Sequence, residues 1–158
     1  MKDDAQIPRT PLLELVCPPQ TDMLRLIRSV VTTVAAELGF PSEETSQIEL
    51  SVDEACTNVI RHAYAEVGPA GVPAPELRVE IRPGPDYLMV RVIDEGSGLP
   101  PEGSRGVSCI EEYAEQEKPK GLGSFIITHF MDEVSYDSPP GMGTVLSMVK
   151  YLRRSQQA

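Results

Sequence analysis

The stretch that decides the fold is residues 48–64, IELSVDEACTNVIRHAY, whose side-chain spacing predicts one helix. Four apolar residues recur at steps of four, three and four, as on a helix face that lies on a core. They are Ile48, Val52, Ala55 and Val59. Glu54, Asn58 and His62 recur at steps of four on a second face, so this helix is expected to present a polar stripe beside its buried one.

Glu54 and Asn58 lie one helical turn apart, so their side chains point the same way. A carboxylate in this position can take a proton, and an amide can hold a hard cation through its carbonyl oxygen. Taken alone, the pair is better explained as solvated polar residues on the outside of an amphipathic helix. The interpretation changes only with the segments that follow.

Length and charge narrow the class of protein. A chain of 158 residues is the size of one domain. Its net charge of −10 argues against nucleic acid as a direct partner, because affinity for nucleic acid comes largely from Lys and Arg. No apolar run approaches the ~20 residues of a membrane span, and the first four residues lack a signal-peptide core. The expectation is a cytoplasmic protein without a membrane segment.

The cysteines are Cys17, Cys56 and Cys109, an odd number at wide spacing. This pattern suggests neither a disulfide framework nor a CxxC metal site, so reduced thiols are expected.

The rest of the chain predicts alternating helices and hairpins. Residues 12–16 fit a strand, and 21–38 fit a helix capped by Thr21 or Asp22 and ended by Gly39. Two hairpins are then predicted from alternating patterns, one at 77–81 with 87–93 and one at 133–137 with 144–152.

Two glycine-rich segments flank a long polar connection. Asp94, at the end of a predicted strand, is followed by Gly96 and Gly98, which let a backbone approach a flat ligand, although a plain turn is as common. The segment GLG at 121–123 precedes a short apolar helix, where unpaired N–H groups can hold an anion; a simple hinge is the alternative. Neither a Walker A pattern nor GxGxxG occurs in the sequence.

Four short motifs nevertheless follow one another in a specific order. They are Glu54-x-x-x-Asn58, Asp94-x-Gly96-x-Gly98, Gly121-Leu122-Gly123 and Gly143-Thr144. This ordered set resembles the N, G1, G2 and G3 boxes of the GHKL (Bergerat-fold) ATPase superfamily. The segments DEACTN at 53–58, HAY at 62–64 and FMDEV at 130–134 are similar to those of the small bacterial anti-sigma-factor serine kinases of the RsbW and SpoIIAB type.

The resemblance implies an α/β (α+β) two-layer sandwich, in which helices cover one face of a mixed, mostly antiparallel sheet. It covers 12–152 as one ATPase domain, with an ATP lid at about 99–120. Residues 1–11 and 153–158 are expected to be tails.

The resemblance also implies roles for individual residues at the phosphate end of an ATP or ADP site. Asn58 would hold Mg²⁺ bridging the phosphates, and Glu54 would be the general base that takes the proton from a serine hydroxyl. Backbone N–H groups would bind the phosphates. They would come from Gly121, Leu122 and Gly123.

At the adenine end, the resemblance implies that Asp94 accepts a hydrogen bond from the adenine amino group, supported by Thr144 directly or through water. Gly96 and Gly98 would keep that wall of the site thin.

The implied activity is that of an ATP-dependent protein serine/threonine kinase and anti-sigma factor. It would bind a sigma factor, phosphorylate a STAS-type anti-anti-sigma factor on serine, contact protein partners through Arg28 and form a homodimer. Two alternatives remain open from the sequence: a nucleotide-gated binding switch without kinase activity, and a switch kinase that controls a phosphatase or signalling complex.

Overall fold

The computed structural model describes residues 13–65, 76–95, 122–138 and 143–153. Within these ranges, three helices and five strands follow one another along the chain. They are β1 (Leu13–Cys17), α1 (Thr21–Leu38), α2 (Ser42–Ala65), β2 (Leu77–Pro83), β3 (Tyr87–Asp94), α4 (Leu122–Phe130), β4 (Glu133–Asp137) and β5 (Thr144–Tyr151). None of the described helices is long and apolar enough to cross a membrane.

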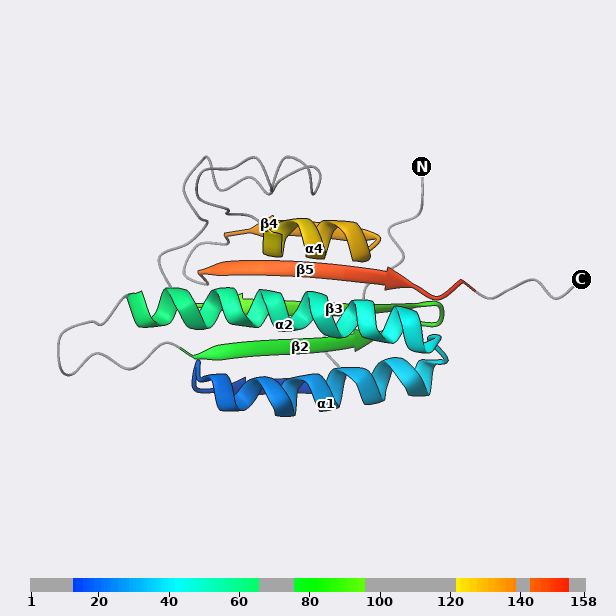
Figure 1. Ribbon diagram of the computed structural model, residues 1–158, viewed down its shortest axis with the longest axis horizontal. Helices are drawn as coiled ribbons and strands as arrows, with labels where there is room; N and C mark the ends of the chain where they lie inside the picture. Colours follow the sequence, from blue (N-terminus) through cyan, green and yellow to red (C-terminus); the bar gives the residue numbers. More distant parts are fainter. Residues whose placement is uncertain (1–12, 66–75, 96–121, 139–142, 154–158) are drawn as a thin grey trace, which may run out of the picture.

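The five strands form one sheet in the order β1-β2-β3-β5-β4, and α1, α2 and α4 lie on one face of it (Figure 1). The expected two-layer sandwich is therefore confirmed. Where the sequence suggested a mixed sheet, however, all pairs of neighbouring strands in the described part of the chain are antiparallel.

The connections explain this difference. Two helices, α1 and α2, link β1 to β2. The chain runs along the sheet once in each helix, so β2 runs in the opposite direction to β1. The single helix α4 leaves β4 running in the same direction as β3, but β5 lies between them and is antiparallel to both.

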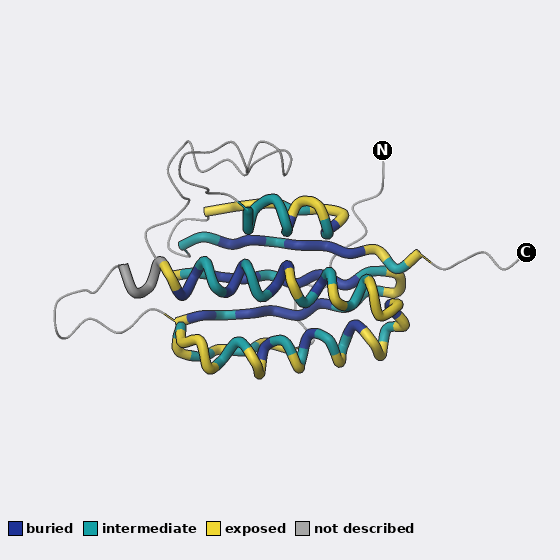
Figure 2. The backbone as a smooth tube through the Cα atoms, in the orientation of Figure 1, coloured by how far each residue is buried: buried dark blue, intermediate teal, exposed yellow. Residues whose placement is uncertain are grey.

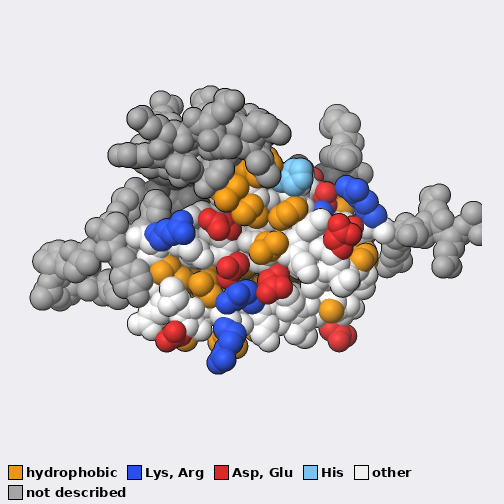
Figure 3. Space-filling model, in the orientation of Figure 1, with side chains coloured by type: hydrophobic (Ala, Val, Ile, Leu, Met, Phe, Trp, Pro, Cys, Tyr) orange, Lys and Arg blue, Asp and Glu red, His pale blue; other side chains and the backbone are white. Residues whose placement is uncertain are grey.

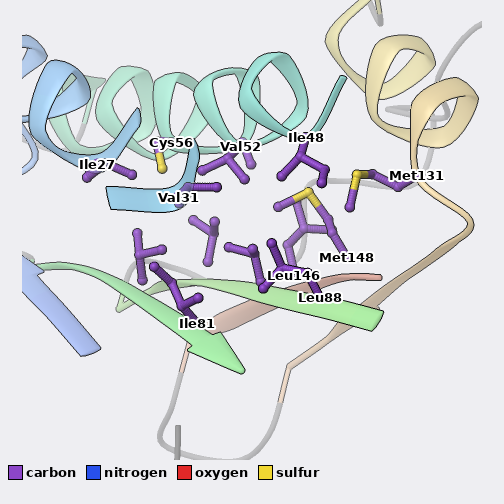
Figure 4. Close-up of a cluster of buried hydrophobic side chains, with 14 of the residues drawn as sticks. Ile27, Val31, Ile48, Val52, Cys56, Ile81, Leu88, Met131, Leu146 and Met148 are labelled. Carbon is purple, nitrogen blue, oxygen red and sulfur yellow. The ribbon is translucent and has the colours of Figure 1, made fainter. Parts of the chain in front are cut away.

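The core lies between α2 and the middle of the sheet, as the apolar stripe of the central helix predicted. Ile48 and Val52 are fully buried, and Ala55 and Val59 are buried beside them. Figure 4 shows side chains from α1 and the sheet meeting this stripe, and Figure 2 shows that the three inner strands are buried along much of their length. Burying such side chains is the main source of stability and fixes α2 on the sheet.

The two ends of α1 differ in how well the sequence predicted them. Gly39 ends the helix in the left-handed conformation, at φ 94°, and its N–H donates to the carbonyl of Ala36 at 3.0 Å. The capping prediction at the other end is wrong, because the N-cap is Gln20 and makes no side-chain capping bond. Thr21 and Asp22 are instead the first helical residues, where an acidic side chain still suits the helix dipole.

The turn between α4 and β4 is tied to the end of β5. Lys150 donates from Nζ to the carbonyl of Phe130 at 2.7 Å, at the C-terminus of α4. Asp132 accepts a hydrogen bond from the N–H of Tyr151 at 2.7 Å and pairs with Arg153 at 3.2 Å. These contacts hold α4 on the sheet and explain part of the FMDEV segment structurally.

Candidate nucleotide-binding site

Glu54 and Asn58 are both half-buried on α2, and the side chain of Glu54 lies against the start of α4. A Cβ atom built on Gly123 would lie 2.6 Å from both Cγ and Cδ of Glu54, and closer still to Oε1. Real Cβ atoms do not approach other atoms so closely, so the absence of a side chain at Gly123 lets the two helices meet here. The structure thus brings together two segments that are far apart in the sequence.

Asp94 and Thr144 are brought together by the register of the sheet, in which they are direct partners at the junction of β3 and β5. Side chains alternate along a strand, so Asp94 shares a face with Val92 and Val90, both buried in the core beneath the helices. Both predicted adenine-contacting residues therefore lie at one end of the helix-covered face of the sheet.

Thr144 has a buried hydroxyl that makes no hydrogen bond to any residue that the structure describes. Buried hydroxyls in proteins almost always have a partner, in the protein, in ordered water or in a ligand. The orphaned Oγ1 of Thr144, directly opposite Asp94, therefore fits a site that is completed by a polar group from outside the chain.

Gly143 is required by both backbone conformation and space. Its φ is +69°, and a Cβ built on it would lie 2.9 Å from the carbonyl carbon of Asp94 and from Cα of Glu95. This glycine lets the start of β5 pack against the end of β3, which sets Thr144 beside Asp94. Gly143 belongs to the ordered motifs but has no role predicted from the sequence; its position directly before a strand was the available signal.

Leu122 and Gly123 are the first two residues of α4. Backbone N–H groups in the first turn of a helix have no acceptor within that helix, so they are available to an anion. The remaining predicted residues Gly96, Gly98 and Gly121, with the predicted lid at 99–120, lie outside the described residues.

Arg28, the predicted partner-contacting residue, lies on α1 beside α2. Its Nε donates to the carbonyl of Leu24 at 3.3 Å and lies 3.3 Å from Oδ1 of Asp53, the residue directly before Glu54. Asp53 has no role predicted from the sequence. A helical-wheel comparison of α1 and α2 could have suggested that Arg28 forms an ion pair with an acidic residue of α2, but not which one.

The thiol of Cys56 is fully buried beside the core. Burial raises its pKa, and the nearby charge of Asp53 raises it further, so Cys56 stays protonated and unreactive. Cys17 is also a free thiol, as predicted, while Cys109 lies outside the described residues.

His129, which received no role from the sequence, is exposed and stacks on Phe125 at 5.3 Å between ring centroids. Within the described ranges, His, Cys, Asp and Glu side chains form no group of three or more that could hold a metal ion. Figure 3 looks onto the helical face, where acidic side chains lie over the middle of α2 and basic ones over the middle of α1, while basic side chains also lie over one end of α2 and acidic ones over both ends of α1.

An antiparallel sheet covered on one face by helices, with an acidic side chain meeting a glycine at a helix start, is consistent with an ATPase domain of the GHKL class. The sequence matches the histidine kinase-like ATPase domain family over residues 17–150, so the chain belongs to that family.

Curated relatives cover most of the chain. A serine-protein kinase RsbW of Halalkalibacterium halodurans is 29% identical over 154 residues, which is 91% of this chain and 85% of that protein. An anti-sigma F factor of Caldanaerobacter subterraneus is 34% identical over 130 residues, covering 82% of this chain and 85% of its own length. An anti-sigma F factor of Bacillus licheniformis is 33% identical over 129 residues, with 82% and 84% covered.

Proposed function

We propose that this protein is an ATP-dependent protein serine kinase that also acts as an anti-sigma factor. It binds a sigma factor and phosphorylates a STAS-type anti-anti-sigma factor on serine. Membership of the histidine kinase-like ATPase family and the names of the relatives support this proposal. The observation that carries it is the contact between Glu54 and Gly123, which sets a proton acceptor beside the N-terminus of α4.

In the proposed reaction, the serine hydroxyl of the partner protein attacks the γ-phosphorus of ATP. Glu54 takes the hydroxyl proton, a bond forms between the serine oxygen and phosphorus, and ADP leaves with the electrons of the broken bond. A positioned base of this kind contributes about 10²- to 10⁴-fold to a rate. Backbone N–H groups of Leu122 and Gly123 in the first turn of α4 would stabilise charge on the phosphates, together with the predicted contribution of Gly121.

The residues present also fit a magnesium ion delivered with the nucleotide. Asn58 lies one turn after Glu54 on α2, half-buried, and its amide oxygen suits a hard cation. When bound, Mg²⁺ would supply positive charge that neutralises part of the charge on the phosphates. We propose Asn58 as its protein ligand.

At the other end of the nucleotide, we propose that Asp94 accepts a hydrogen bond from the adenine amino group. The buried hydroxyl of Thr144, which has no hydrogen-bond partner in the described part of the chain, supports a polar ligand or a bridging water at this place. Gly96 and Gly98 are proposed to form the adjoining wall.

The remaining proposals concern partners. We propose that Arg28, whose side chain is 41% exposed beside the Glu54 turn of α2, contacts the protein partners. We further propose that the protein is cytoplasmic and forms a homodimer. Sedimentation of the purified protein would test the homodimer directly.

Phosphate transfer is the decisive experiment. Wild-type protein is incubated with γ-labelled ATP, Mg²⁺ and each purified STAS-domain protein of the native host, and labelled serine is identified by mass spectrometry. We expect one such protein to be labelled. If no STAS-domain protein gains phosphate from the wild type, the kinase proposal is wrong.

Glu54→Gln separates a kinase from a nucleotide-gated binding switch. In a kinase it abolishes transfer and leaves ATP affinity nearly unchanged, because the amide keeps the shape but cannot take a proton. The matched control is Glu49→Gln, which removes another half-buried carboxylate from α2. If the protein is a nucleotide-gated switch that transfers no phosphate, neither Glu54→Gln nor Glu49→Gln can reduce phosphate transfer, because the wild type shows none.

A further inference from the structure

Arg28 is held at one edge of its guanidinium group. Within the described part of the chain its hydrogen bond is made by Nε, to the carbonyl of Leu24, and its closest ion-pair contact is also from Nε, to Asp53 at 3.3 Å. The two terminal amines make no hydrogen bond to any described residue. An arginine fixed in this way keeps a pair of parallel donors for another group.

Asp53 makes the same contact from the other side. Its Oδ1 is buried and receives no hydrogen bond of good geometry from the residues that the structure describes, although Arg28 lies within ion-pair distance. A buried carboxylate oxygen is costly without a nearby cation, so the position of Asp53 draws the guanidinium toward α2. The pair thereby restricts a long side chain that would otherwise sample many rotamers.

The charges near Arg28 favour an acidic group as the binding partner of the two terminal nitrogens of its guanidinium group. In a chain of net charge −10, Arg25 and Arg28 lie three residues apart on α1 and so place two positive charges on neighbouring positions of the helix surface. Carboxylates match the paired donors of a guanidinium geometrically, and complementary charges steer such encounters.

We infer that Asp53 is a positioning residue, which holds Arg28 by Nε so that its terminal amines can bind a carboxylate of the protein partner. This inference rests on the proposed function, since it assigns the partner-contacting role of Arg28 to a defined geometry. A partner bound in this way lies beside the turn of α2 that carries Glu54.

The geometry is tested first in the free protein. The Nε–H signal of Arg28 is assigned by its loss in Arg28→Lys, and its hydrogen exchange is followed by NMR. We expect Asp53→Ala and Asp53→Asn both to speed this exchange, because each removes the negative charge that holds Nε of Arg28 against α2. Equal exchange in wild type and Asp53→Ala would overturn the inference, whatever the protein's activity.

Partner affinity is tested next by calorimetry with the STAS-domain protein that accepts phosphate in the transfer assay. Asp53→Ala is expected to weaken binding about two- to fivefold, the range for a partly exposed ion pair. Arg28→Ala should weaken it further, and Asp53→Ala should then add nothing in the Arg28→Ala background. Tighter binding after Asp53→Ala would mean that Asp53 screens Arg28, and a loss that persists without Arg28 would mean that Asp53 acts elsewhere; either result overturns the inference.

The controls separate this inference from the kinase proposal. Glu49→Ala removes a carboxylate one turn earlier on α2, which has no ion pair among the described residues, and should leave partner affinity unchanged. ATP affinity should stay constant in all variants if they are folded. Normal phosphate transfer with unchanged affinity in Asp53→Ala would refute the inference alone, whereas a wild type that neither binds nor labels any STAS-domain protein would refute both.

Discussion

Gly123 at the start of α4 and Glu54 on α2 are in contact, with no room between them for even one methyl group. This contact ties the position of the proposed base to the helix end that is proposed to bind phosphates. A change at either residue therefore alters both parts of the proposed site.

We predict that Gly123→Ala slows phosphate transfer by about 100-fold, because the new methyl group pushes the carboxylate of Glu54 from its place and small displacements of a base have large costs. Transfer of labelled phosphate under single-turnover conditions measures the effect. Thr128→Ala is the control on the same helix, since Thr128 bonds only to carbonyls of its own helix among the described residues. Full activity in Gly123→Ala would show that Glu54 does not need its present position.

Asn58→Ala is expected to remove the part of ATP affinity that depends on Mg²⁺, because the amide oxygen is the proposed ligand of the ion. Calorimetric titrations with Mg²⁺ and with a chelator give the two affinities. Thr57→Ala, at the neighbouring half-buried position, should keep the difference between them. If Asn58→Ala keeps it as well, another group holds the metal.

Thr144→Val gives a prediction with opposite signs for stability and binding. The substitution replaces a buried hydroxyl, which makes no hydrogen bond within the described ranges, by a methyl group of similar size, so the free protein should be as stable as the wild type or more so. ATP affinity should fall about three- to tenfold, the value of one hydrogen bond. Thermal unfolding without nucleotide and calorimetry with ATP test the two halves, and unchanged affinity would contradict the proposed adenine contact.

The thiol of Cys56 gives a prediction about pH. Burial raises its pKa in the folded protein, so above about pH 8.5 the unfolded chain loses this proton while the folded one keeps it. The unfolded state then binds fewer protons, and the free energy of unfolding falls as the pH rises. Urea denaturation between pH 8 and 10 should show a shallower fall in Cys56→Ala than in wild type; parallel slopes would disprove the effect.

The local elements were predictable because each leaves its own periodic pattern in the sequence. The stripe from Ile48 to Val59 is buried as expected, and the two hairpins form where alternation predicted them. Gly39 ends α1 as predicted, since a left-handed residue at that position strongly favours glycine. The cap at Thr21 or Asp22 was wrong because helix boundaries depend on backbone geometry that neighbouring residues can satisfy equally well.

The order of the strands and the packing of the helices against one another were harder to predict from the sequence. The placement of β5 between β3 and β4, and with it the loss of any parallel pair among the described strands, depends on long-range packing that no local pattern encodes. The pairing of Arg28 with Asp53 likewise depends on which faces of α1 and α2 meet. For the site, the ordered motifs anticipated that Glu54 and Gly123, and Asp94 and Thr144, belong together, but their chemical roles remain predictions.

The interior position of β5 has a consequence for how the protein is made. During translation, β1 is synthesised about 60 residues before β2, the strand with which it pairs. The strands β3 and β4 are joined through β5, which is synthesised after both of them. At about 5–20 residues per second, the early strands wait several seconds with open edges. Until β5 is synthesised, the nascent chain lacks the strand that sets Thr144 beside Asp94, so binding of nucleotide is expected only once translation has passed Tyr151.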